Sequence, residues 1–122
     1  MLDTHVLLWV ADNRLAAASC EMIGQADVVR LSAASVWEIE IKRALGKLSA
    51  PQDIAQLAVQ AGYEPLAISF EHAVEAARLP PHHGDPFDRM LVAQARLEGL
   101  TLATADARMT PYGVAVLEVA RA

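Results

Sequence analysis

Hydrophobic positions follow two different spacings along the chain. Short runs rich in β-branched residues, which are typical of strands, lie at 28–32, 66–68, 100–104 and 114–119. Between them, apolar residues recur every three or four positions, which predicts helices over 4–10, 15–26, 34–45, 51–61, 70–79 and 86–98. Because strands alternate with helices, the pattern predicts an α/β domain with a mostly parallel sheet.

Local signals mark several ends of these helices. Ser69 is suited to cap the helix that follows it, and Asp85–Pro86 combines a cap with a proline at the first helical position. Pro51 is likewise expected in a first turn, and Gly99 is expected to end a helix. The segment 80–84 contains two prolines and a glycine, so it is predicted to be a loop.

Composition limits the kind of protein. With 122 residues, 54% of them hydrophobic and 20% charged, the chain is expected to form one compact domain over residues 1–122. It has no apolar run near the roughly 20 residues that a membrane-spanning helix needs, and its start lacks the features of a signal peptide. Cys20 is the only cysteine, which excludes an internal disulfide and a thiolate metal cage. We therefore expect a reducing, cytoplasmic setting.

Four acidic residues occupy equivalent places in the predicted fold. Asp3 and Asp106 lie at or just past the carboxyl ends of predicted strands, whereas Glu38 and Asp88 lie in the first two turns of helices. In a parallel α/β sheet these places share one edge, where ligands bind. We therefore expect the four carboxylates to meet.

Carboxylates gathered in this way repel one another and need cations. Hard oxygen donors suit Mg²⁺ or Mn²⁺, and two such ions can activate water and stabilise the leaving group in phosphodiester hydrolysis. The net charge of −5 is compatible with this site, because the four acids supply most of it and two divalent ions would cancel their charge.

Each acid also has an ordinary local explanation. Asp3 can cap a helix, and Asp106 lies in a turn-forming stretch. Glu38 is four residues before Lys42, where a helix ion pair adds about 0.2–0.5 kcal/mol. Asp88 can complement the dipole of its helix. Only the joint pattern of the four indicates a site.

Asp85 is the main ambiguity within this set, since it is acidic and three residues before Asp88. A helical side chain leans toward the amino end of its helix, where the edge of the sheet lies. This direction favours Asp88 as the metal ligand and Asp85 as the helix cap.

The remaining polar and aromatic candidates have weaker signals. His82 and His83 adjoin the site in sequence; we expect exposed loop residues, with contact to the phosphodiester substrate or a change of protonation near neutral pH as the alternatives. Trp9 and Trp37 lie at apolar helical positions and are expected in the core or at a dimer face. Phosphate contacts, or alternatively a solvated helix face, are expected of the basic residues Lys42, Arg43, Lys47 and Arg89.

Four stretches of the chain resemble the PIN-domain family, and within it the VapC-type toxins of toxin–antitoxin pairs. In family order they are Leu2–Trp9, Ser32–Ile39 with Lys42 and Gly46–Leu48, His83–Leu91 and Leu102–Asp106. The resemblance implies a PIN-like three-layer fold, in which a mostly parallel central sheet carries helices on both faces. It also implies a Mg²⁺- or Mn²⁺-dependent endoribonuclease, a cognate antitoxin and a homodimer.

By the same resemblance, the family's acidic metal site corresponds to Asp3, Glu38, Asp88 and Asp106. Thr4 and Thr104 match the polar residues that flank it. One departure is that only Met1 and Leu2 precede Asp3, where the family's first strand has several apolar residues. A strand this short is expected to bury little apolar surface and to hold Asp3 loosely. The sequence leaves open whether the true start lies upstream of Met1.

These observations together predict hydrolysis of RNA by metal-activated water, leaving a 5′-phosphate and a 3′-hydroxyl. Asp3, Asp88 and Asp106 would bind metal directly, and Glu38 would bind a second ion or orient the water. One alternative is a catalytically silent PIN-fold module that only binds a partner protein. Another is a metal-dependent DNase or phosphatase, although His5 stands where a phosphatase would carry its second acid.

Overall fold

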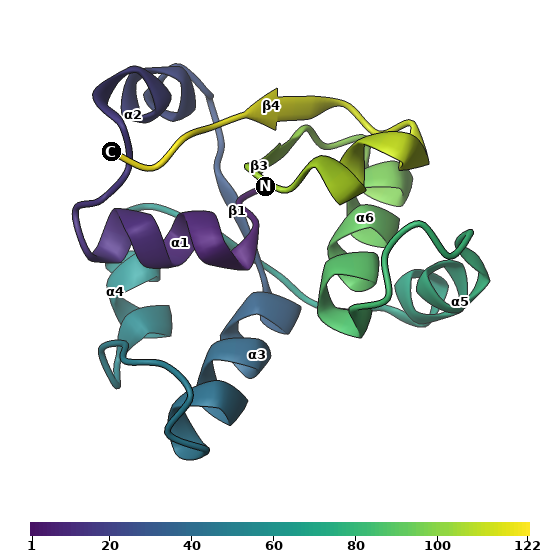
Figure 1. The fold of residues 1–122 in the computed structure, drawn as a ribbon, viewed down its shortest axis with the longest axis horizontal. Helices are drawn as coiled ribbons and strands as arrows, with labels where there is room; N and C mark the ends of the chain where they lie inside the picture. The colour runs from purple at the N-terminus through teal and green to yellow at the C-terminus, as the bar shows by residue number, and fades with distance from the viewer.

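The computed structural model describes residues 1–122 and contains six α-helices, one 3-10 helix and four short strands (Figure 1). The helices are α1 (Thr4–Ala11), α2 (Ala17–Gly24), α3 (Ala33–Ala44), α4 (Ile54–Gln60), α5 (Phe70–Arg78), α6 (Pro86–Glu98) and η1 (Ala107–Tyr112). The strands are β1 (Arg30–Ser32), β2 (Glu64–Leu66), β3 (Leu102–Thr104) and β4 (Val116–Glu118).

The strands form two parallel pairs, which residues 1–3 join. β1 pairs with β2, and β3 pairs with β4. Between the pairs, the Leu2 amide donates to the Arg30 carbonyl at 3.2 Å and the Asp3 amide donates to the Ala103 carbonyl at 3.0 Å. The Ala103 amide in turn donates to the Met1 carbonyl at 2.9 Å. The predicted mostly parallel sheet is confirmed, with residues 1–3 at its centre.

This central position corrects one expectation about the amino-terminal strand. Leu2 is 1% exposed and Asp3 is 2% exposed, so the strand is buried despite its length. Neighbours on both sides hold its backbone, and the Met1 amino group donates to the Thr101 carbonyl at 2.7 Å. Asp3 is therefore firmly held, because backbone pairing across the sheet compensates for the short apolar run.

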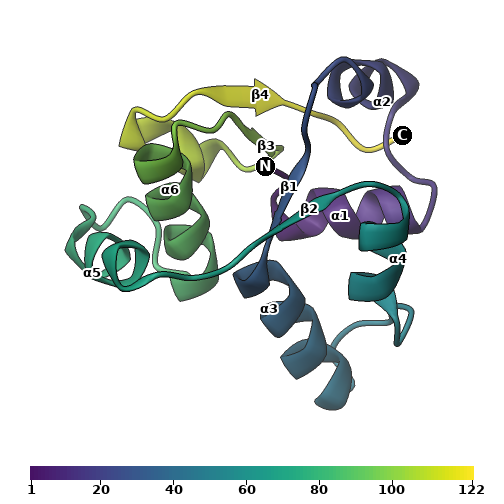
Figure 2. The ribbon, with the colours of Figure 1, turned by 180° about the vertical axis from the view of Figure 1, so that it is seen from behind.

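Helices cover both faces of the sheet, as predicted. Successive strand residues point to opposite faces: Met1 and Leu102 pack in a core with α5 and α6, whereas Leu2 and Ala103 pack in a core with α1 and α4. Figure 2 shows the same separation from behind, with α5 and α6 on one side of the N-terminus and α1, α3 and α4 on the other. The carboxyl edge of the sheet therefore lies between two groups of helices.

Most elements are a few residues shorter than predicted, and two boundaries differ for a clear local reason. β2 covers Glu64–Leu66 rather than 66–68, because the Glu64 amide pairs with the Val29 carbonyl at 2.9 Å and fixes the register on β1. α4 begins at Ile54 rather than Pro51, because residues 51–54 form a turn in which the Ile54 amide donates to the Pro51 carbonyl. Both differences arise from local pairing that an apolar pattern does not encode.

Other predicted signals are confirmed. Ser69 caps α5 through a capping box with His72, and Asp85 and Pro86 begin α6. Gly99 ends α6 in the left-handed conformation, with φ of 65°. None of the helices combines the length and the apolar character that crossing a membrane requires.

Candidate active site

Asp3 connects the first strand to α1 at the edge of the sheet. Its Oδ1 accepts from the His5 amide at 2.7 Å, so the predicted helix cap is present. Its Oδ2 accepts from the Thr104 hydroxyl at 2.5 Å. Because Thr104 ends β3, this bond fixes the Asp3 carboxylate against the neighbouring strand.

Thr104 also orders the next acid. Its Oγ1 accepts from the Asp106 amide at 3.0 Å, so one hydroxyl connects Asp3 with the turn that carries Asp106. Thr4, the other flanking threonine, lies farther from the carboxylates in the hydrogen-bond network. It donates to the Ser35 hydroxyl at 2.9 Å and ties the start of α1 to α3.

Asp85 and Asp88 divide their tasks at the start of α6. Oδ1 of Asp85 accepts from the amides of Phe87 and Asp88, at 2.8 and 3.1 Å, so Asp85 is the helix cap, as predicted. Asp88 lies in the first turn and is 8% exposed. Its carboxylate is free of the cap and faces the site.

The Asp88 carboxyl is strongly perturbed. Burial raises its pKa, and the negative charges of Asp85, Asp3 and Glu38 raise it further, to about 7, against a lowering effect of His83. A carboxylate responds in this way when other carboxylates lie close to it in a partly desolvated place. Asp3, Glu38 and Asp88 therefore share one electrostatic environment.

Glu38 contributes a buried and half-satisfied carboxylate from α3. Its Oε2 accepts from the Lys42 ammonium at 2.5 Å, which is the helix ion pair expected from the sequence. Its Oε1 is buried and has no hydrogen-bond partner. An unpaired buried carboxylate oxygen is costly, so a cation at this point would be stabilising.

Asp106 is the most exposed of the four acids, with 24% of its side chain accessible. It caps η1 by accepting from the Arg108 amide at 2.9 Å. The Arg108 guanidinium also donates to both carboxylate oxygens, at 2.8 and 3.0 Å, and these bonds hold the pKa of Asp106 well below its usual range. Asp106 is therefore ionised at neutral pH.

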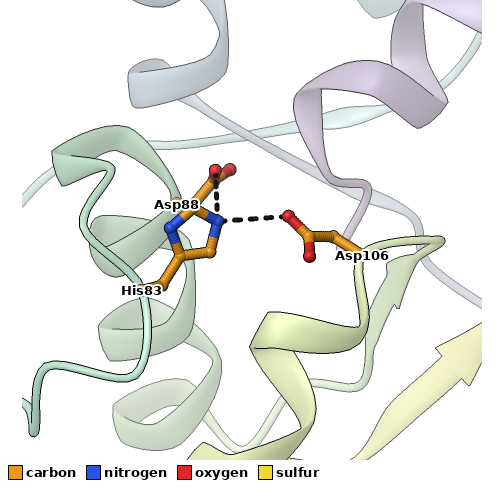
Figure 3. A group of neighbouring side chains, drawn as sticks. All are labelled: His83, Asp88 and Asp106. Carbon is orange, nitrogen blue, oxygen red and sulfur yellow. Dashed lines mark hydrogen bonds and ion pairs between the residues drawn. The ribbon is translucent and has the colours of Figure 1, made fainter.

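His83 was expected to be an exposed loop residue, and this expectation is wrong. His83 is 4% exposed, and its Nε2 lies 3.0 Å from Oδ2 of Asp88 and 3.1 Å from Oδ2 of Asp106 (Figure 3). The ligand atoms of these three residues lie within 4.8 Å of one another. The prolines around His83 indicated a loop correctly, but they carry no information on whether a loop side chain turns inward. His82 is exposed, as expected.

The basic residues behave differently from one another. Lys42 reaches Glu38, whereas Lys47 is exposed. Arg43 pairs with Glu40 and with the carbonyl of Pro51.

The guanidinium of Arg89 is bound within the protein and is not free to contact a phosphate. Its guanidinium donates to four carbonyls that end α5 or lie in the following loop, those of Ala76, Leu79, Pro80 and His83. The expected phosphate contact from Arg89 is therefore not supported.

Trp37 is 59% exposed, so of its two expected positions the core is wrong and the dimer face stays a prediction. Its ring makes an edge-on contact with Phe87, with centroids 5.2 Å apart. Trp9 is half-buried against the core beneath α1. Exposure of Trp37 leaves an aromatic surface between α3 and the start of α6.

These residues fit a divalent cation. The site offers a buried carboxylate oxygen without a partner at Glu38, an acid at Asp88 whose ionisation is suppressed by its neighbours, and an ionised carboxylate at Asp106. All are hard oxygen donors, which Mg²⁺ and Mn²⁺ prefer. The arrangement is that of an acidic site at the carboxyl edge of a parallel sheet.

The fold and this edge define the class of protein: the chain belongs to the PIN-domain family, whose family model matches residues 1–114. Among curated proteins it is similar to Ribonuclease VapC22 of Mycobacterium tuberculosis (strain ATCC 25618 / H37Rv), with 32% identity covering 92% of this chain and 90% of the relative.

Solved structures support the same fold. FitAcB from Neisseria gonorrhoeae matches with a TM-score of 0.64 and 20% identity, covering 96% of this chain and 95% of the other. FitAB bound to an IR36 DNA fragment matches with a TM-score of 0.65 and 20% identity, covering 95% and 92%. The PIN fold predicted from the sequence motifs is thus confirmed.

Proposed function

We propose that this chain is a Mg²⁺- or Mn²⁺-dependent endoribonuclease and the toxin of a toxin–antitoxin pair. The observation that carries the proposal is the gathering of the buried carboxyl groups of Asp3, Glu38 and Asp88 in one site, where burial and the neighbouring acids raise the pKa of Asp88 to about 7. A cation bound among these carboxylates would relieve their repulsion and favour the ionised form of Asp88. Similarity to Ribonuclease VapC22 supports RNA as the substrate.

Each acid has a distinct task in this proposal. Asp3, Asp88 and Asp106 bind the cation directly, and Glu38 binds a second ion or orients the attacking water through its unpartnered Oε1. When bound, the cation polarises the water and the phosphodiester and stabilises the leaving oxygen. Thr104 holds Asp3 and the turn that carries Asp106 in place relative to each other. In this proposal the cleavage products carry a 5′-phosphate and a 3′-hydroxyl.

The partners in the proposal are an RNA substrate, a cognate antitoxin and a second copy of the chain in a homodimer, acting in the cytoplasm. Similarity to Ribonuclease VapC22 and to the FitAcB and FitAB structures supports the antitoxin. Two basic residues remain candidates for phosphate contact: Lys42 on α3, the helix that carries Glu38, and Lys47 in the turn after it. The argument for a catalytically silent module was a loosely held Asp3, and the burial of Asp3 removes it.

The proposal is tested by incubating the full chain with total RNA, with and without Mn²⁺, and mapping the cleaved ends. We expect Mn²⁺-dependent cuts with 5′-phosphate ends, and no cuts with Asp3→Asn or Asp88→Asn. Asp53→Asn is a matched control, because Asp53 is exposed and precedes α4, a helix that carries none of the four acids. Cleavage by Asp3→Asn at the parent rate would contradict the assignment, and preferential cleavage of single-stranded DNA in a parallel reaction would favour a DNase.

A further inference from the structure

We propose that His83 is a positioning residue of the acidic site: its imidazole donates from Nε2 to the carboxylate of Asp106 and contacts the carboxyl group of Asp88, and so fixes the two acids relative to each other. The inference rests on the proposed function, since it concerns the same metal-binding acids. It assigns a task to a side chain that neither the sequence motifs nor the acidic pattern marked as functional.

The protonation pattern of the ring follows from its other nitrogen. Nδ1 of His83 lies 3.1 Å from the Asp85 backbone amide, which donates to it. A backbone amide always carries its hydrogen, so Nδ1 must be an acceptor and bears no proton. A neutral imidazole then carries its single proton on Nε2, the atom that faces Asp88 and Asp106.

The Nε2–H group lies beside two carboxyl groups, which repel each other when both are ionised. Oδ2 of Asp88 and Oδ2 of Asp106 come from different segments, the start of α6 and the turn before η1, and both approach the same nitrogen (Figure 3). Their mutual repulsion would drive the carboxylates apart if nothing lay between them. The hydrogen bond from Nε2 to Asp106 at 3.1 Å and the 3.0 Å contact of the same nitrogen with Asp88 set the separation of these two oxygens before any cation is present.

The backbone of His83 is held at both its amide and its carbonyl. The His83 amide donates to the Tyr112 hydroxyl at 2.8 Å, and that hydroxyl donates to the Pro80 carbonyl at 2.9 Å. The Arg89 guanidinium donates to the His83 carbonyl at 3.3 Å. Because the residue is also buried, the imidazole cannot rotate into solvent and its donor stays aimed at the carboxylates.

The same geometry argues against His83 as a metal ligand. Ligation through Nε2 would require that nitrogen to lose its proton, and the proton could move only to Nδ1. Nδ1 would then no longer accept from Asp85, and the turn that caps α6 would lose a bond. The donor set therefore consists of oxygens alone, which suits Mg²⁺ or Mn²⁺ and not zinc.

The ring state is tested by long-range ¹⁵N–¹H correlation NMR on the full chain, without metal and then with Mg²⁺, which is diamagnetic. We expect Nε2 of His83 to give the shift of a protonated nitrogen, and Nδ1 that of an unprotonated one, in both conditions. Loss of the Nε2 proton on addition of Mg²⁺ would make His83 a ligand and would overturn the inference.

The positioning task is tested by Mn²⁺ titration calorimetry on three variants. His83→Leu removes the donor, and we expect Mn²⁺ affinity to fall about 10- to 100-fold, the usual effect of losing a group that orders metal ligands. His83→Gln restores an N–H donor at similar reach and should recover most of that loss, while His82→Leu controls for a neighbouring exposed histidine. Circular dichroism checks that each variant is folded.

Different results would overturn the proposed function and the positioning task of His83. If the parent chain binds no Mn²⁺, the proposed function fails and the task of His83 fails with it. If the parent binds Mn²⁺ and His83→Leu binds equally well, or His83→Gln binds no better than a folded His83→Leu, only the inference about His83 is overturned. RNA cleavage is not needed for any of these readouts.

Discussion

At the scale of single residues, the protonation of Asp88 affects both the stability of the fold and the ability of the site to bind a cation. Its carboxyl is buried beside three other acids, and its pKa lies near 7 instead of near 4. The ionised form that a cation requires is therefore the form that the metal-free protein disfavours. This opposition gives the site a dependence on pH that a solvent-exposed acid would not have.

Asp88→Asn should stabilise the metal-free protein at high pH. The folded state binds the Asp88 proton more tightly than the unfolded state, so the parent loses stability as pH rises from about 4 to about 7. Each pKa unit corresponds to about 1.4 kcal/mol, so the advantage of the variant in free energy of unfolding should grow by about 2–4 kcal/mol over that range. Urea unfolding at pH 4.5 and pH 8 in a chelator measures it; an advantage that shrinks with pH would contradict the assigned burial.

Glu38 and Glu40 provide a matched pair on one helix. Glu38 is buried with an unpartnered oxygen, whereas Glu40 is exposed and pairs with Arg43. Glu38→Gln should lower the Mn²⁺-dependent cleavage rate about 10-fold or more, because it removes a charged donor from the site. Glu40→Gln should leave the rate unchanged, and equal effects of both changes on gel-based RNA cleavage would show that Glu38 has no special task.

At the scale of elements, the connection between α5 and α6 depends on Arg89. Its guanidinium bonds the carbonyls of Ala76 and Leu79 at the end of α5 and those of Pro80 and His83 in the loop. Carbonyls at a helix end lack partners within the helix, and a cationic donor is the group that suits them. The loop that carries His83 is thereby fixed to α6.

Arg89→Ala should therefore destabilise the fold by about 1.5–3 kcal/mol, the usual contribution of bonds to a charged group. Arg96→Ala is the control on the same helix, since Arg96 is exposed and faces Glu75 at 3.5 Å, and its cost should stay within about 0.5 kcal/mol. Chemical denaturation measures both values. An unchanged stability in Arg89→Ala, combined with a weaker salt dependence of RNA binding, would restore the phosphate contact predicted from the sequence.

The sequence predicted those elements whose signals are local. Ser69 and Asp85 begin helices where capping chemistry places them, and Gly99 ends one. The first strand was underestimated because its stability comes from residues 30 and 103, which lie far from Leu2 along the chain. The register of β2 was missed for the same reason, since it is set by pairing with β1.

The site shows the same division between local and distant information. Acidic residues at strand ends and helix starts could be predicted to meet, because the topology of a parallel α/β sheet brings those ends together. The burial of His83 could not, because it depends on Tyr112, which lies 29 residues away. Nor could the apolar spacing show that Trp37 stays exposed, since exposure depends on which helices pack over α3.

At the scale of the whole molecule, the proposed metal site would couple cation binding to folding, because the net charge is −5 and the acids lie at one edge of the sheet. A cation that binds only the folded state raises the free energy of unfolding by about 2.7 kcal/mol at a concentration of 100 times its dissociation constant. Mn²⁺ should therefore raise the melting temperature of the parent chain, measured by differential scanning calorimetry, and EDTA should reverse the rise.

The variants decide whether this stabilisation comes from the site. Asp88→Asn should melt higher than the parent without metal, because it lacks the repulsion. Both Asp88→Asn and Asp3→Asn should gain little when Mn²⁺ is added, because each lacks a ligand. Asp53→Asn should follow the parent in both conditions. If Asp88→Asn gains as much from Mn²⁺ as the parent does, the ion binds elsewhere on the acidic surface, and the convergence of acids at the sheet edge is then not a metal centre.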